Sequence, residues 1–290
     1  MKIKQLAFMW ISISLVMANS ADARITIDTR GSDTLMIVAQ VWAEEYHRYN
    51  PKVAVSVSGG GSGVGIAALI NGTVNIANAS RKMKPKEIEM AARQGFQPEE
   101  YVVGQDALTI YVHKKNPITS LSLSQLAEIN GEEGSIVKWS QLGITVPGCK
   151  GQEILRISRQ SSSGTYYHYR RTILGKSQDF KLGSFDMHGS KDVVTLVEKT
   201  PCAIGYSGLA YATADVKLVC ISETEESPCI FPSIETANDR SYPISRPLYM
   251  YTRGKPAGEI KKYIDWVRSD AGQCLLLKSG YAPLREVTCE

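Results

Sequence analysis

Between a strand-like pattern and a helix-like pattern lies the segment Ser58-Gly59-Gly60-Gly61-Ser62-Gly63-Val64-Gly65. Two more segments place glycine and hydroxyl residues directly before a predicted helix: Thr29-Arg30-Gly31-Ser32-Asp33-Thr34 and Arg159-Gln160-Ser161-Ser162-Ser163-Gly164-Thr165. The first turn of a helix has unpaired N–H groups and the positive end of the helix dipole, which together favour an anion. Each segment alone is compatible with an ordinary helix N-cap. Three of them in one chain, one with the two-pronged donor Arg159, predict an oxyanion site.

Working outward from these segments, strand and helix patterns alternate along the chain. Apolar–polar alternation predicts strands over residues 24–28 and 53–57, and a long apolar stretch predicts one over residues 101–113. Shorter strands are predicted over residues 74–77, 154–157, 203–206 and 248–252. Apolar residues at helical spacing predict helices over residues 35–49, 63–71, 85–94, 124–130, 164–174, 191–198 and 258–268. Residues 222–238 are polar and rich in turn formers, which predicts a surface excursion. This order predicts an α/β architecture with mainly parallel sheets.

Composition excludes several classes of protein. The 290 residues are 43% hydrophobic and 21% charged, which is typical of a folded soluble protein. The net charge of +4 is too small to favour a nucleic-acid partner, and no run of five basic residues occurs. Aromatic and basic residues do alternate over residues 166–171, but on a helix they point in different directions, which favours partial burial. We therefore expect no nucleic-acid partner.

The N-terminus has the three parts of a secretory signal peptide. Lys2 and Lys4 precede an apolar stretch over residues 6–17, and Ala21-Asp22-Ala23 supplies a small-x-small exit. The apolar stretch is too short to span a bilayer, and no later one is longer. We expect residues 1–23 to be removed after Ala23 and the mature protein to be soluble outside the cytoplasm.

Six cysteines fit an oxidising compartment. They are Cys149, Cys202, Cys220, Cys229, Cys274 and Cys289. No pair has the C-x-x-C spacing of a zinc site, so we expect no metal, and disulfides persist outside the cytoplasm. Many pairings are open to six cysteines. Proximity in the sequence favours Cys220–Cys229 and Cys274–Cys289, which leaves Cys149–Cys202.

An ordered set of short motifs resembles one family. The motifs are Gly31-Ser32-Asp33-Thr34, Ser58-Gly59-Gly60-Gly61-Ser62-Gly63, Ala67-Ala68-Leu69-Ile70-Asn71-Gly72-Thr73, Ala79-Ser80-Arg81, Ser163-Gly164-Thr165, Ala203-Ile204-Gly205-Tyr206-Ser207-Gly208 and Ser279-Gly280-Tyr281-Ala282-Pro283-Leu284. Together they resemble the PstS-like phosphate-binding proteins of ABC-type uptake systems, over essentially all of the mature chain. Each motif is weak by itself, and the order of the whole set carries the resemblance.

The resemblance implies a type II periplasmic-binding-protein fold, in which two α/β lobes close over one anion and two strands form the hinge. We expect the crossings near residues 112–114 and 246–248. Lobe one then comprises residues 24–111 plus 247–290, and lobe two residues 112–246. The implied function is a periplasmic protein, expected to be a monomer, that binds inorganic phosphate and delivers it to the membrane-embedded permease of an ABC transporter. An anion bound by both lobes would stabilise the closed form.

The resemblance also implies a ligand set. Carried over by position, it consists of Thr34, Leu35 (through its backbone N–H), Ser62, Arg159, Ser163, Gly164 and Thr165. The neighbouring Ser32, Asp33, Gly63, Ser80 and Arg81 complete the predicted phosphate-binding residues.

Two positions depart from the family pattern. Ser80 stands where some members have an aspartate that accepts the proton of HPO₄²⁻ and repels sulfate. We expect Asp33 either to take over that acceptor role or to serve as a helix N-cap. Ser161 replaces an acidic residue that often orients the arginine, so Arg159 is expected to be held differently here.

Other functions stay open at this point. One is a binding protein for sulfate, molybdate or tungstate, and another is a secreted phosphohydrolase with Ser163 or Thr34 as its nucleophile. Catalysis would need a base or a metal beside that hydroxyl. The four histidines are scattered, and Asp106 and Asp186 have no obvious partners in the sequence. The expected protein is therefore not an enzyme and uses no cofactor. A surface adhesion or signalling protein that reuses the fold is a further possibility.

Overall fold

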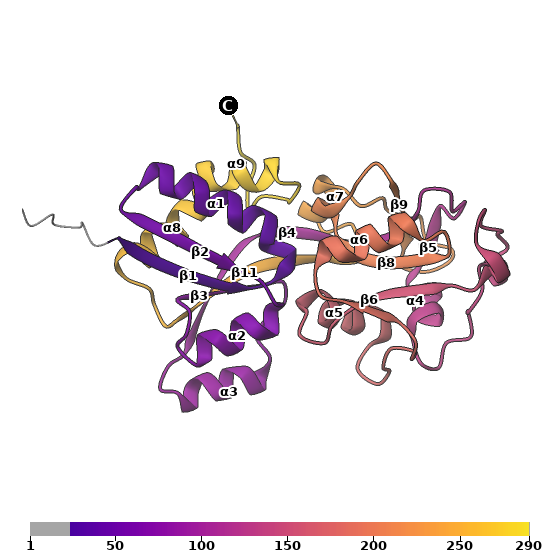
Figure 1. The fold of residues 1–290 in the computed structure, drawn as a ribbon, viewed down its shortest axis with the longest axis horizontal. Helices are drawn as coiled ribbons and strands as arrows, with labels where there is room; N and C mark the ends of the chain where they lie inside the picture. The colour runs from indigo at the N-terminus through magenta and orange to yellow at the C-terminus, as the bar shows by residue number, and fades with distance from the viewer. Residues whose placement is uncertain (1–23, 290) are drawn as a thin grey trace, which may run out of the picture.

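The computed structural model describes residues 24–289, so the predicted signal peptide lies outside the described residues. Two groups of helices lie side by side along the long axis of the molecule (Figure 1). Those of lobe one are α1 (Met36–Tyr49), α2 (Ser62–Ile70), α3 (Pro85–Arg93), α8 (Gly258–Arg268) and α9 (Asp270–Lys278). Those of lobe two are α4 (Leu123–Asn130), α5 (Gly164–Tyr169), α6 (Ser190–Lys199) and α7 (Ile234–Asn238).

One sheet path runs through both lobes in the order β2-β1-β3-β11-β4-β8-β6-β7, with β9 also paired to β4. Its strands are β1 (Ile25–Gly31), β2 (Val53–Ser58), β3 (Ile76–Ala79), β4 (Pro98–His113), β6 (Leu155–Arg159), β7 (Phe185–Met187), β8 (Ala203–Gly208), β9 (Val216–Leu218) and β11 (Ser245–Arg253). A separate ribbon pairs β5 (Ser120–Ser122) with β10 (Cys220–Ser222).

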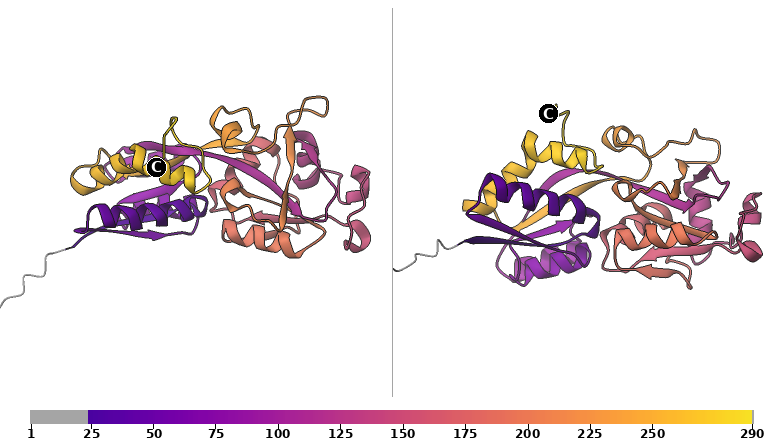
Figure 2. Two further views of the ribbon diagram at one scale, coloured as in Figure 1. Left: turned by 90° about the horizontal axis from the view of Figure 1, so that it is seen from above. Right: turned by 45° about the horizontal axis from the view of Figure 1, so that its top comes forward.

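Two long strands, β4 and β11, connect the lobes, as both views in Figure 2 show. β4 pairs with β11 from Pro98 to Ala107 and with β8 from Leu108 onward. Every antiparallel pairing in the large sheet involves one of these two strands, while the pairings β1–β2, β1–β3, β6–β7 and β6–β8 are parallel. β4 changes its partner from β11 to β8 between Ala107 and Leu108, a few residues before the predicted end of the first segment of lobe one at residue 111. The lobe limits stay a prediction.

Each lobe has its own core, built from the helical spacing seen in the sequence. In lobe one, Val38, Trp42 and Tyr46 recur along one face of α1 and are buried against Tyr263 of α8. In lobe two, buried aromatic rings include Tyr169, which stacks on Tyr206 with ring centroids 4.0 Å apart. Because the apolar clusters lie mainly within the lobes, the contact between the lobes is the place where the predicted anion segments can meet.

Several elements were not predicted. α9 was missed because it follows α8 after Ser269 alone and contains Gly272, which interrupts the helical pattern. The predicted helix over residues 164–174 is split into α5 and a π-helical turn, Arg170–Leu174. The surface excursion contains the short helix α7, which Ser233 caps by accepting from the Thr236 N–H.

The three disulfides predicted from proximity are confirmed. Cys149–Cys202, Cys220–Cys229 and Cys274–Cys289 close separations of 53, 9 and 15 residues. Replacing Cys149 and Cys202 together with alanine is expected to lower the free energy of unfolding by about 4 kcal/mol, because the longest loop loses the largest entropic restraint. The same change at Cys220 and Cys229 is expected to cost about 1–2 kcal/mol less. Urea unfolding of both variants checks this, and a larger loss from the short loop would contradict it.

Candidate oxyanion site between the lobes

Three helix starts meet where the two lobes face each other. In lobe one, the 3₁₀ turn Asp33–Leu35 leads into α1, and α2 begins at Ser62. In lobe two, α5 begins at Gly164. The lobes touch directly here, since the Gly63 N–H donates to the Ser162 carbonyl over 2.9 Å. The structure therefore brings together all three segments that the sequence singled out.

Two glycines allow close packing at this site, Gly31 within lobe one and Gly164 between the lobes. Gly31 has a φ of +141°, and a Cβ there would lie 2.1 Å from the Asn78 carbonyl oxygen. A Cβ on Gly164 would lie 2.3 Å from Ser62 Oγ and 2.5 Å from Ser80 Oγ. The start of α5 can therefore lie against the hydroxyls of lobe one only because residue 164 has no side chain.

Four buried hydroxyls form the centre of the site. Thr34 Oγ1 and Thr165 Oγ1, from opposite lobes, lie 2.9 Å apart. Ser62 Oγ accepts a hydrogen bond from the Ser80 N–H over 3.0 Å and lies 3.4 Å from Ser80 Oγ. Hydroxyls buried together in this way can donate hydrogen bonds to an anion in place of the water that the anion loses on binding.

A buried arginine that sequence reasoning missed serves this cluster. Arg246 lies on β11, is 2% exposed, and donates from Nη2 to Thr34 Oγ1 over 3.1 Å and to Thr165 Oγ1 over 3.0 Å. Its Nη1 donates to the Ser80 carbonyl over 3.3 Å. A permanent charge therefore lies directly behind the two threonine hydroxyls, on a hinge strand rather than in a glycine-rich segment.

Asp106 is the counter-charge of Arg246. Asp106 Oδ2 accepts from Nε and Nη2 of Arg246 over 3.0 and 2.8 Å, and the two residues lie directly opposite each other in the β4–β11 pairing. The sequence showed no obvious partner for Asp106, because its partner is 140 residues away along the chain. The pairing of these two residues across the sheet leaves no signal in the local sequence of either strand.

Arg159 is held by protein groups of both lobes. Its Nη2 donates to Asp33 Oδ2 over 2.8 Å and to the His188 carbonyl over 2.6 Å, and its Nη1 donates to Ser190 Oγ over 2.9 Å. Burial lowers the pKa of the Arg159 guanidinium, and the Asp33 carboxylate opposes that shift. Asp33 supplies the acidic partner that the sequence lacks at Ser161, and the pair links lobe one to lobe two.

The other predicted ligands lie at the site with protein partners of their own. The Leu35 N–H donates to the Ser32 carbonyl over 3.1 Å. Ser163 Oγ caps α5 by accepting from the N–H groups of Thr165 and Tyr166. Ser32 Oγ is buried and has no hydrogen-bond partner among the described residues. That these residues bind the anion stays a prediction.

Arg81 borders the cluster but pairs with a carboxylate. Its Nη2 donates to Glu87 Oε1 over 2.6 Å, and the side chain is 6% exposed. The guanidinium also lies 5.4 Å from the ring of Tyr167 in lobe two, and Lys84 Nζ lies 4.6 Å from the same ring. Through these cation–π contacts, Arg81 and Lys84 of lobe one contact lobe two.

His168 follows the third anion segment and gives a pH prediction. Burial lowers the pKa of His168 to about 3, and nearby Arg246 acts in the same direction. As pH falls below the ordinary value of 6.5, the unfolded chain takes up a proton that the folded protein excludes, so the free energy of unfolding falls. Replacing His168 with glutamine is expected to reduce that loss by about 2–3 kcal/mol between about pH 6.5 and pH 4.5. Urea unfolding at both pH values checks this, and parallel pH dependences would contradict it.

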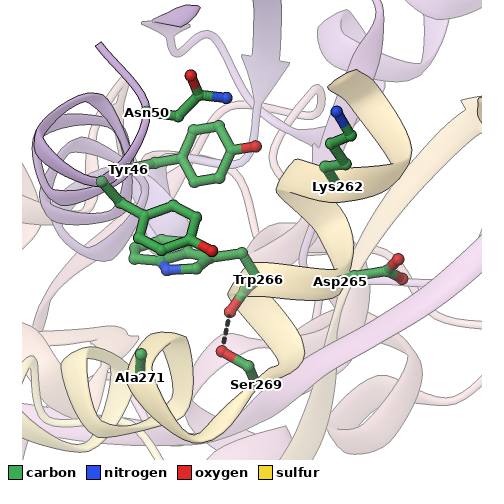
Figure 3. Close-up of a pocket in the computed structure, with 8 residues that line it drawn as sticks. Tyr46, Asn50, Lys262, Asp265, Trp266, Ser269 and Ala271 are labelled. Atoms are coloured by element: carbon green, nitrogen blue, oxygen red, sulfur yellow. Dashed lines mark hydrogen bonds between the residues drawn. The ribbon is translucent and has the colours of Figure 1, made fainter. Parts of the chain in front are cut away.

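A groove of about 960 Å³ lies elsewhere on lobe one (Figure 3). Its walls are formed by aromatic rings such as Tyr46 and Trp266 and by surface residues of α8, including Lys262. Lys262 Nζ is paired with Glu259 Oε1 over 2.7 Å. The groove lacks the three helix starts and the arginines of the cluster between the lobes, so that cluster is the candidate oxyanion site.

Among the described residues, no helix is long and apolar enough to cross a membrane, and no group of histidine, cysteine and carboxylate side chains could hold a metal ion.

The chain is similar in sequence to proteins of known function. A family model described as a PBP superfamily domain matches residues 17–271. The phosphate-binding protein PstS of Pseudomonas aeruginosa is 35% identical over 265 residues, which cover 88% of this chain and 81% of that protein. The protein SphX of Synechococcus elongatus is 30% identical over 92% of this chain and 79% of its own length.

Two solved structures are similar in shape and sequence. One is a Clostridium perfringens protein described as a phosphate ABC transporter substrate-binding protein and solved with bound phosphate. It has a TM-score of 0.79 and 26% identity over 90% of this chain and 100% of its own. An ABC-type phosphate transport receptor from Vibrio cholerae has a TM-score of 0.68 and 27% identity, covering 88% and 99% of the two chains.

Proposed function

Because this chain belongs to the PBP superfamily and, within it, to the PstS-like phosphate-binding proteins, we propose that it binds inorganic phosphate between its lobes and delivers it to an ABC transporter. The fold, of the type II periplasmic-binding-protein class, supports a cycle in which the open protein captures the anion and the closed protein carries it. The anion is bound and released without chemical change.

One observation carries the proposal. Thr34 of lobe one and Thr165 of lobe two share the Nη2 donor of Arg246, which comes from a hinge strand. Because Arg246 donates to both hydroxyl oxygens and one hydroxyl donates to the other, the proton of the remaining hydroxyl is free to point at a ligand oxygen. An anion bound there contacts both lobes and the hinge at once, so its binding energy favours closure.

The contacts of the hydroxyls support binding rather than hydrolysis. A nucleophilic hydroxyl needs a base within hydrogen-bond reach. The described partners of Thr34 Oγ1 are Arg246 and Thr165, and those of Ser163 Oγ are two backbone N–H groups. None of these partners can accept a proton from the hydroxyl and hold it as a base.

Titration calorimetry on protein unfolded and refolded to remove bound anion tests the proposal. Phosphate is expected to bind one to one, and a Thr165→Val variant, which keeps the shape of the side chain without its hydroxyl, is expected to bind about tenfold more weakly. Molybdate titrated in parallel tests the alternative oxyanions. Absence of phosphate binding to the refolded wild-type protein would overturn the proposal.

Export is part of the same proposal. Cleavage after Ala23 would release a mature chain that begins at Arg24, close to the start of β1. Mass spectrometry of protein recovered from the periplasm of an expressing bacterium checks this directly. A mass that includes residues 1–23 would contradict export with cleavage.

A further inference from the structure

Two tyrosine hydroxyls hold the backbone of the first anion segment, and they come from different lobes. The Tyr281 hydroxyl donates to the Thr34 carbonyl. The Tyr211 hydroxyl donates to the carbonyl of the preceding residue, Asp33. Both carbonyls belong to the 3₁₀ turn Asp33–Leu35, which leads into α1. Two consecutive peptide groups of this turn are therefore held by side chains that lie outside the predicted ligand set.

The bond from Tyr281 lies within lobe one. The Tyr281 ring is 1% exposed and packs in the same apolar cluster as Leu35. The segment that carries this ring is fixed to β4, because Ala282 exchanges two backbone hydrogen bonds with Gln105, over 2.8 and 3.0 Å. The bond from Tyr281 to Thr34 therefore does not depend on contact between the lobes.

The bond from Tyr211 joins the two lobes. Tyr211 ends the 3₁₀ turn η5 (Leu209–Tyr211), which follows β8, and its ring packs against the apolar cluster of lobe two that includes Ile157. Its hydroxyl reaches lobe one, where it donates to Asp33 and accepts from the Ile37 N–H in the first turn of α1. Figure 1 shows β8 and α1 on opposite sides of the contact between the lobes. Because ring and hydroxyl are held by different lobes, these bonds form only when the lobes meet.

A groove of about 510 Å³ lies beside this contact. Asp33 and Ile37 line it on one side, and Lys191 and Tyr211 line it on the other. Burial raises the pKa of the Tyr211 hydroxyl, and the Asp33 carboxylate acts in the same direction, so the hydroxyl stays protonated and able to donate. When the lobes part, water from the groove can replace both partners of the hydroxyl, so the open protein loses little by their separation.

The turn that these bonds fix carries two predicted ligands. They are the side-chain hydroxyl of Thr34 and the backbone N–H of Leu35, which shares a peptide group with the Thr34 carbonyl. Donation to a carbonyl polarises its peptide group and strengthens the N–H of that group as a donor. Groups that are fixed before they meet a ligand also lose less conformational entropy on binding. Tyr281 supplies a permanent part of this restraint, and Tyr211 supplies a part that appears on closure.

We propose that Tyr211 is a positioning residue for the anion site, which fixes the turn Asp33–Leu35 in its binding geometry only in the closed protein. Tyr281 is its permanent counterpart. This inference rests on the proposed phosphate-binding function and adds to it a link from closure to the geometry of the ligands. Because the bond from Tyr211 forms after the anion has been captured, it slows release and does not assist capture.

Tyr211→Phe tests this, because it removes the hydroxyl and keeps the ring in lobe two. In titrations of refolded, anion-free protein, the variant is expected to bind phosphate about tenfold more weakly. The change is expected in the dissociation rate constant, measured by chasing bound radiolabelled phosphate with unlabelled phosphate. The association rate constant is expected to stay within about twofold of wild type. The urea midpoint of the anion-free variant is expected to match that of the wild-type protein, a result that a purely structural role would not give.

Two further variants are matched controls. Tyr281→Phe removes the permanent bond, so it is expected to weaken phosphate binding and also to lower the urea midpoint. Tyr263→Phe removes a buried hydroxyl that has no hydrogen-bond partner within residues 24–289, and it is expected to leave the affinity and both rate constants unchanged.

The outcomes are distinct. If Tyr211→Phe bound and released phosphate as the wild-type protein does, this inference would be overturned and phosphate binding would stand. A slower association with an unchanged dissociation rate constant would also overturn it. So would a fall in the urea midpoint like that of Tyr281→Phe with unchanged release, since Tyr211 would then serve the fold alone. Wild-type protein that binds no phosphate would overturn the proposed function and this inference with it.

Discussion

Arg246→Met is expected to weaken phosphate binding about a thousandfold and to lower the free energy of unfolding by about 3–5 kcal/mol. The first effect follows because Arg246 is the charge that contacts the hydroxyls of both lobes. The second follows because the variant leaves Asp106 buried without its counter-charge. Titration calorimetry measures the first quantity and urea unfolding the second.

Two further variants separate the two effects. Arg246→Lys keeps a positive charge beside Asp106 but loses the fork that reaches Thr34 and Thr165 together, so stability is expected to recover more than phosphate affinity. The double variant Asp106→Asn with Arg246→Met removes both buried charges and is expected to regain stability without regaining binding. If Arg159→Met abolished binding while Arg246→Met left it within tenfold of wild type, the roles of the two arginines would be reversed.

The difference between these arginines shows what the sequence could reveal. Arg159 was found from the sequence because it stands in a serine- and glycine-rich segment before a helix, where local chemistry alone indicates an anion. Arg246 stands in a strand, four residues after Tyr242 and next to Pro247, with no local feature that marks a site. Its role depends on pairing across the sheet with Asp106, a contact that periodicity along the chain cannot report.

The same reasoning explains which parts of the fold were predictable. Strongly periodic segments such as α1 and α8 were located from the sequence because one face of each is buried. The short strands β5, β7, β9 and β10 were not, since three residues are too few to show a period of two. Likewise, the hydrogen bonds that both Asp33 oxygens accept, from Arg159 and from the Gly60 N–H, were not predicted, because both contacts are long-range.

Contacts between the lobes contribute to the free energy of closure. Asp33 with Arg159, Thr34 with Thr165 and the ring of Tyr167 with Lys84 all form only when the lobes meet. A bound anion therefore does not have to supply all of the energy of closure. It follows that a change which blocks the approach of the lobes will reduce affinity even if it leaves every ligand-binding side chain in place.

Gly164→Ala is such a change, and it is expected to weaken phosphate binding about a hundredfold while the free energy of unfolding stays within about 1 kcal/mol of wild type. The added methyl would lie 2.3 Å from Ser62 Oγ and 2.5 Å from Ser80 Oγ, both on the opposite lobe, so it is harmless in the open form. Alanine is also a good helix former at the start of α5. Titration calorimetry measures the affinity, and small-angle scattering with saturating phosphate measures whether the radius of gyration still contracts.

Gly205→Ala is the matched control for this prediction, because its added methyl meets only groups of its own lobe. It would lie 2.9 Å from side-chain carbons of Val193 and Val197, so we expect it to lower stability and to leave phosphate affinity within about threefold of wild type in protein that remains folded. The two glycine variants thus have opposite expected effects on stability and binding. If Gly164→Ala instead lowered stability and kept its affinity, the contact between α5 and the serine hydroxyls would be part of a permanent interface, and closure over the anion would have to occur elsewhere.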